Sequence, residues 1–176
     1  KGAMIDILIL GDSLVADYDW QARIPSERVT TFGMPGIGTA NLLSLLPAIK
    51  QKVDRAAVIM VMAGTNDLLG GDLHFGETLK KIYVQLRHDY PGGEILATSL
   101  LPMDLPHLPP GTIVRLNSEI AALSMQTGCC YLDIHSRFSG SAKVIFQEDG
   151  VHLTVAAYEI WTRALLEHIA FLVEDD

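Results

Sequence analysis

The stretch MIDILILGDSLVADYDW, residues 4–20, carries an apolar run directly into the turn Gly11-Asp12-Ser13. The run from Ile5 to Leu10 has the length and composition of a buried strand. A glycine at its end allows a sharp turn, and a serine after such a turn presents its hydroxyl at the mouth of a cleft. The stretch therefore predicts a buried first strand that ends at a side chain able to do chemistry.

Similar apolar runs recur along the chain and decide the fold class. Further runs of strand length lie at residues 28–32, 56–63, 94–100 and 129–134. Apolar residues at helical spacing mark segments that include Leu42, Leu79, Ile113 and Tyr158. Strands that alternate with helices favour a parallel sheet. We therefore predict an α/β fold, a flavodoxin-like three-layer α/β/α sandwich with about five parallel strands and helices on both faces.

The composition limits the size, partners and compartment of the protein. With 176 residues, 49% of them hydrophobic, the chain suffices for one domain, which we assign to residues 4–176, with residues 1–3 as a remnant of cloning. A net charge of −8 disfavours nucleic acid and anionic membrane surfaces as partners. No apolar run approaches the roughly 18 residues of a membrane span. Cys129 and Cys130 are adjacent, form no disulfide framework and are interpreted as small buried hydrophobes. Because nothing in this pattern requires an oxidising compartment, we expect a cytoplasmic location.

Residues suited to catalysis follow three of the predicted strands. Ser13, Gly36 and Asn66 each stand just beyond the carboxyl end of a strand, where ligands bind in open parallel sheets. The serine could act as a nucleophile, while the glycine N–H and the asparagine amide could donate hydrogen bonds to a ligand oxygen. Each also has a structural interpretation, namely a helix cap, a glycine turn and an Asx-turn. Asp67 is interpreted as structural, bonding the backbone of its own loop.

Two Asp–His pairs could supply a general base. Asp149 and His152 lie three residues apart around Gly150, so the carboxylate can curl round to Nδ1 and leave Nε2 facing outward. The rival pair, Asp133 and His135, would share one face at the end of the fifth strand. We favour the first pair, because a turn brings the two side chains together whereas a straight strand separates them.

Four blocks in this order resemble the SGNH hydrolases, also called the GDSL family. The blocks are GDSL at residues 11–14, Gly36 after the second strand, GTND at residues 64–67 and DGVH at residues 149–152. The resemblance implies that Ser13 is the nucleophile, His152 the general base and acid, and Asp149 the residue that orients the imidazole. It also implies an oxyanion hole made by the N–H groups of Ser13 and Gly36 and the amide of Asn66.

The same resemblance implies a serine hydrolase that cleaves small or single-chain carboxylic esters through an acyl-enzyme, with no cofactor and no metal. Sugar O-acetyl esters, lysophospholipids and thioesters remain alternative substrates, and the oligomeric state stays open. We expect Asp12, Leu14, Leu101 and Met103 to contribute to substrate binding. Competing functions are a metal-dependent phosphoesterase using Asp12, Asn66, Asp67 and His152, and a binding module without catalysis.

Overall fold

The sheet at the centre of the molecule is built from five parallel strands in the order β2-β1-β3-β4-β5. The computed structural model describes residues 2–174. The strands are β1 (Asp6–Gly11), β2 (Arg28–Gly33), β3 (Val58–Val61), β4 (Glu94–Thr98) and β5 (Cys130–Leu132). This strand order is the flavodoxin-like one, so the predicted fold class is confirmed.

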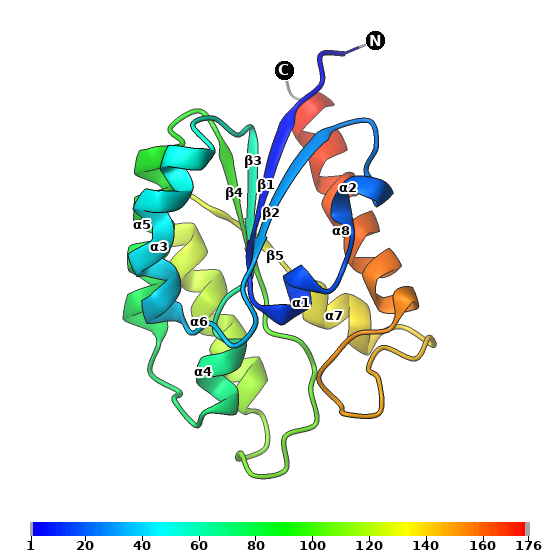
Figure 1. The fold of residues 1–176 in the computed structure, drawn as a ribbon. Helices are drawn as coiled ribbons and strands as arrows, with labels where there is room; N and C mark the ends of the chain where they lie inside the picture. The colour runs from blue at the N-terminus through cyan, green and yellow to red at the C-terminus, as the bar shows by residue number, and fades with distance from the viewer. Residues whose placement is uncertain (1, 175–176) are drawn as a thin grey trace.

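Helices cover both faces of the sheet and complete a three-layer α/β/α sandwich (Figure 1). One face carries α3 (Thr39–Lys52), α4 (Thr65–Leu69), α5 (Gly76–Asp89) and α6 (Thr112–Gln126). The other face carries α1 (Ser13–Ala16), α2 (Trp20–Arg23), α7 (Ile134–Ser139) and α8 (Val155–Glu174). None of the helices within residues 2–174 combines the length and the apolar character needed to cross a membrane.

The core explains why the central strands are apolar without alternation. Residues Ile7 to Leu10 of β1 and Val58 to Val61 of β3 are all buried, because helices cover both of their faces. The strand that follows β1 in the chain, β2, lies on one side of it, and all later strands lie on the other side. The strand order therefore switches between β1 and β3, and ligands of such folds bind beyond the carboxyl ends of the strands at this switch point. In Figure 1 this edge lies opposite the two chain termini.

The structure departs from the sequence prediction mainly around the fifth strand. That strand is short and ends at Leu132, because Asp133 begins α7 by accepting a hydrogen bond from the Ser136 N–H at 2.9 Å. Cys129 and Cys130 are free thiols and only half-buried, so the expectation that both are buried is wrong.

Candidate active site

The turn after β1 holds Ser13 on rigid backbone. Asp12 is the N-cap of α1, and its Oδ1 accepts a hydrogen bond from the Leu14 N–H at 2.9 Å. Gly11 is required for close packing, since a Cβ there would lie 2.8 Å from the Met62 carbonyl oxygen. Gly33 is required likewise, since its Cβ would lie 2.4 Å from the Ala16 nitrogen. Ser13 is therefore the half-buried first residue of a helix wedged against two strands.

Gly36 lies in a tight turn after β2. The Ile37 N–H donates to the Met34 carbonyl at 3.1 Å, and Gly36 has a φ of +80°. Proline followed by a glycine with positive φ is typical of a type II turn, and the sequence Pro35-Gly36 fits that pattern. Within residues 2–174 the Gly36 N–H has no hydrogen-bond partner, so it is available to a ligand.

Asn66 is held beside the Gly36 turn. Its Nδ2 donates one hydrogen bond to the Ile37 carbonyl at 2.9 Å. A primary amide has two N–H donors, so this bond fixes the side chain and leaves the second N–H for another acceptor. The residue comes from α4, the helix that follows β3. Asn66 and Gly36 therefore lie together although 30 residues of chain separate them.

Asp67 ties α4 to the start of α3. Its carboxylate accepts hydrogen bonds from the Thr39 N–H at 3.0 Å and from the Thr39 hydroxyl at 2.9 Å. Asp67 thus caps the N-terminus of a helix that belongs to a different part of the chain. Its role is structural, but the partner is Thr39, so the predicted bond to its own loop is wrong.

The turn before α8 brings Asp149 onto His152. Oδ1 of Asp149 accepts hydrogen bonds from the N–H groups of Val151 and His152, both at 2.9 Å, and Oδ2 contacts Nδ1 of His152. Gly150, at a φ of +72°, gives the bend. The carboxylate therefore fixes both the backbone and the ring of His152.

The other ring nitrogen of His152 faces α1. Nε2 lies 3.8 Å from Oδ2 of Asp17, and the Asp17 N–H donates to the Ser13 carbonyl at 2.9 Å. Residues four apart on a helix share a face, so Asp17 and Ser13 lie on the same side of α1. No hydrogen bond joins Ser13 to His152 among the described residues. Asp17 is not among the site residues predicted from the sequence, because a helix as short as α1 leaves no periodic pattern.

The structure places the rival pair differently. Asp133 caps α7 and His135 lies within that helix, so the prediction that they share a strand face is wrong. The Asp133 carboxylate is bonded to the backbone and hydroxyl of Ser136. The Asp133 carboxylate thus serves as the cap of α7.

Carboxylates set the electrostatics around the imidazole. The hydrogen bond with His152 lowers the pKa of Asp149 to about 2, and the same bond raises the pKa of His152 above its usual value. Asp12 is only 2% exposed, and its Oδ2 has no hydrogen-bond partner within residues 2–174. This burial raises the pKa of Asp12 to about 6. The imidazole therefore sits in a negative environment that favours its protonated form.

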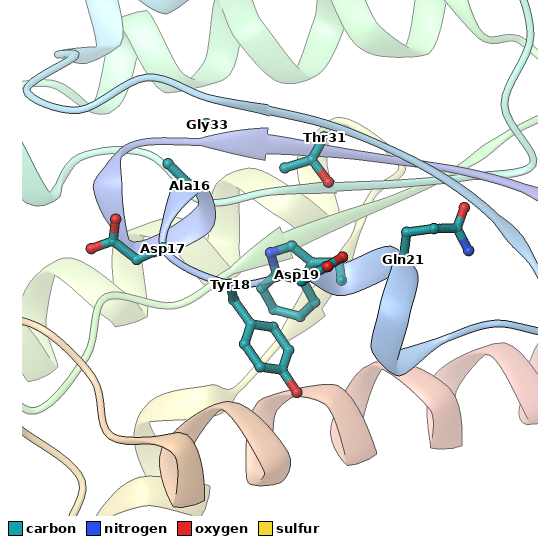
Figure 2. Close-up of a pocket in the computed structure, with 8 residues that line it drawn as sticks. Ala16, Asp17, Tyr18, Asp19, Gln21, Thr31 and Gly33 are labelled. Atoms are coloured by element: carbon teal, nitrogen blue, oxygen red, sulfur yellow. The ribbon is translucent and has the colours of Figure 1, made fainter.

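The residues expected to bind substrate lie in different surroundings. Leu14 and Leu101 are fully buried in the core, so neither lines an open pocket, and Asp12 caps α1. Met103 lines a hollow of about 440 Å³ between the proline-rich loop at residues 102–111 and His135. A second pocket, of about 640 Å³, lies between α1, α2 and β2, and Asp17, Tyr18 and Thr31 are part of its wall (Figure 2).

Within residues 2–174, no three His, Cys, Asp or Glu side chains gather closely enough to hold a metal ion. Of the four residues considered for a metal site, Asp67 is bonded to Thr39 and Asn66 to Ile37. The Asp67 carboxylate is thus engaged in a contact that shapes the loops, and the bond of Asn66 is made by its amide N–H.

The sequence and fold were compared with known proteins. The profile of the GDSL-like lipase/acylhydrolase family matches residues 9–160. No match is found among the curated proteins.

Solved structures share the fold over nearly the whole chain. TesA has 22% identity and a TM-score of 0.76, over 92% of this chain and 96% of TesA. A Streptococcus pneumonia protein whose name refers to platelet activating factor has 26% identity and a TM-score of 0.79, over 94% of this chain and 84% of its own. A catalytic mutant of Axe2, an acetylxylan esterase from Geobacillus stearothermophilus, has 18% identity and a TM-score of 0.77, over 95% and 94%.

Proposed function

Because this chain belongs to the GDSL-like lipase/acylhydrolase family and is an ester hydrolase, we propose that it cleaves small or single-chain carboxylic esters through an acyl-enzyme on Ser13. The observation that carries the proposal is the contact of Asp149 with Nδ1 of His152, which turns Nε2 toward the face of α1 that bears Ser13. Residues 4–176 form the catalytic domain in this proposal.

The proposed reaction begins at the Ser13 hydroxyl. A serine hydroxyl is a weak nucleophile until a base takes its proton, and Nε2 of His152 is the base in this scheme. As Oγ attacks the ester carbonyl, the imidazolium is stabilised by the Asp149 carboxylate. Nε2 then gives the proton to the leaving alcohol, and a water molecule deprotonated by the same nitrogen hydrolyses the acyl-enzyme.

Three donors would stabilise the negative oxygen of the tetrahedral intermediate. They are the N–H groups of Ser13 and Gly36 and the second N–H of the Asn66 amide. Support comes from the Gly36 N–H, which has no partner in the described part of the chain, and from the bond that orients Asn66 toward the same turn. Donors that are already fixed act strongly, because they need no reorganisation when the charge develops.

Sugar acetates are the second candidate substrates. Axe2, which shares the fold, is an acetylxylan esterase, and the half-exposed Asp149–His152 pair leaves the candidate site accessible to a bulky alcohol. Lysophospholipids and thioesters stay open as further members of the same reaction class.

An ester panel that varies acyl length and alcohol, run with matched variants, tests this proposal. Ser13→Ala should lower kcat by at least about three decades and Asn66→Ala by about two to three decades, with the fold unchanged. Ser118→Ala, which removes an exposed hydroxyl on α6, is the control and should keep full activity. Activity that survives Ser13→Ala, or that disappears on exhaustive chelation, would contradict the acyl-enzyme.

A further inference from the structure

Asp17 lies beside the base of the proposed site, one helical turn after the nucleophile. It follows Ser13 by one helical turn and its Oδ2 is 3.8 Å from Nε2 of His152. The side chain is 50% exposed, and its carboxylate makes no hydrogen bond with any residue of the described range 2–174. The Asp17 carboxylate can therefore interact with a ligand, whereas the Asp149 carboxylate is bonded to His152.

The chemistry of the reaction brings the leaving alcohol to this carboxylate. The alcohol oxygen must come within about 3 Å of Nε2 to take its proton. The carbon atoms attached to that oxygen then pass close to Asp17, because Asp17 faces the same nitrogen. A charge on the alcohol therefore interacts with the Asp17 carboxylate at the step that releases the alcohol.

The pocket beyond Asp17 has the lining that a cation prefers. Its volume is about 640 Å³, its wall includes Asp17 and Tyr18, and none of its lining residues is basic (Figure 2). The Asp19 carboxylate on the same wall is partly used, since it caps α2 by accepting from the Ala22 N–H at 3.0 Å.

We propose that Asp17 is a specificity-determining residue that favours esters whose leaving alcohol carries a positive charge, such as a quaternary ammonium group. The inference rests on the proposed function, because it assumes that Nε2 of His152 protonates the alcohol. Two unit charges about 6 Å apart in largely aqueous surroundings give a preference of about threefold over a neutral alcohol of the same shape. An anionic alcohol is disfavoured by the same interaction.

A pair of isosteric esters measures this preference directly. The probes are the choline ester and the 3,3-dimethylbutyl ester of one acid, chosen as the acid that the wild type cleaves best. The measured quantity is the ratio of the two kcat/KM values, in the wild type and in Asp17→Asn. Any change in His152 basicity cancels in this ratio, because both esters use the same enzyme, and the comparison between enzymes cancels the intrinsic reactivity of the esters.

The wild-type ratio should exceed that of Asp17→Asn by about threefold and should shrink as salt is added, since exposed charges are screened. The control is Asp54→Asn, which removes the same charge at the opposite edge of the sheet and should keep the wild-type ratio. The salt dependence of the wild type tests the inference even if Asp17→Asn folds poorly.

Ratios that agree within twofold in the wild type and Asp17→Asn, a shift of equal size in Asp54→Asn, or a wild-type ratio insensitive to salt would each overturn the inference. These results differ from failure of the proposed function, in which neither ester is hydrolysed or hydrolysis survives Ser13→Ala.

Discussion

The pKa of His152 governs both halves of the proposed reaction, since the imidazole must be neutral to accept the Ser13 proton. The Asp149 hydrogen bond raises that pKa, partial burial opposes it, and the charges of Asp17 and Asp12 raise it further. We therefore expect kcat/KM to rise with pH through a pKa above the usual value of about 6.5. Measuring kcat/KM from pH 5 to 9 gives the pKa of this rise, the acid limb of the pH profile.

Asp149→Asn provides the matching test, because it removes the charge and leaves a side chain of the same shape. The acid limb should move to lower pH, and kcat should fall because the imidazolium loses its partner. If the limb stays in place while kcat falls, the carboxylate orients the ring without setting its basicity.

Asp12 gives a separate prediction, about stability. Burial raises the pKa of Asp12 in the folded protein to about 6, whereas the pKa of an Asp in the unfolded chain is about 3.9. Between these values the native state binds more protons than the unfolded state, so the free energy of unfolding falls as pH rises from about 4 to about 6. Asp12→Asn should lack this component, and the wild type should lose up to about 3 kcal/mol relative to the variant.

Denaturant unfolding at pH 4.0 and 7.5 measures the difference between the two proteins. Asp19→Asn, at the exposed N-cap of α2, makes the same replacement in a cap with the same kind of hydrogen bond and controls for the loss of a capping carboxylate. Parallel curves for wild type and Asp12→Asn would show that the Asp12 carboxyl is not held in its neutral form.

Among the secondary-structure elements, the tie between α4 and α3 connects two of the proposed oxyanion donors. Asp67 bonds the first residue of α3, and its neighbour Asn66 bonds the turn that contains Gly36. Asp67→Ala should therefore cost about 1 kcal/mol as a lost helix cap. It should also lower kcat about tenfold with little change in KM, because Asn66 loses its fixed position while the pocket stays intact.

Asp133→Ala is the matched control for this prediction, since it removes a cap of the same kind from α7. Its cost in unfolding free energy should be similar, with kcat unchanged. Equal losses of kcat in the two variants, measured with unfolding curves beside steady-state kinetics, would remove the link between Asp67 and the site.

The elements differ in how far the sequence could predict them. The four long helices and the presence of β1 and β3 were readable, because continuous apolar runs and helical spacing are local signals. The four-residue α1 is too short for a periodic pattern, so the shared face of Ser13 and Asp17 could not be recognised. The Asp67–Thr39 bond joins residues 28 positions apart, so no local signal predicts it. The start of α7 was taken for the end of a strand, because a capping Asp resembles any other polar residue at a strand end.

At the scale of the whole molecule, α8 connects the two parts of the site that come from opposite ends of the chain. It follows the His152 turn directly, and the Tyr158 hydroxyl donates to the Leu14 carbonyl of α1 at 2.5 Å. Tyr158 also stacks on Tyr18, with ring centres 4.4 Å apart. This contact fixes the helix that carries Ser13 against the helix that carries the histidine turn.

Tyr158→Phe should consequently affect both stability and catalysis. Loss of the buried hydrogen bond should cost about 1 to 2 kcal/mol. Because a small displacement of reacting groups is expensive in rate, kcat should also fall about three- to tenfold. Tyr90→Phe removes a comparable bond, from the Tyr90 hydroxyl to the Val53 carbonyl at 2.8 Å, at the edge of the sheet remote from Ser13. Unfolding free energies should drop in both variants while kcat drops only in Tyr158→Phe, and an equal kcat in the two would mean that α8 contributes packing without aligning His152 on Ser13.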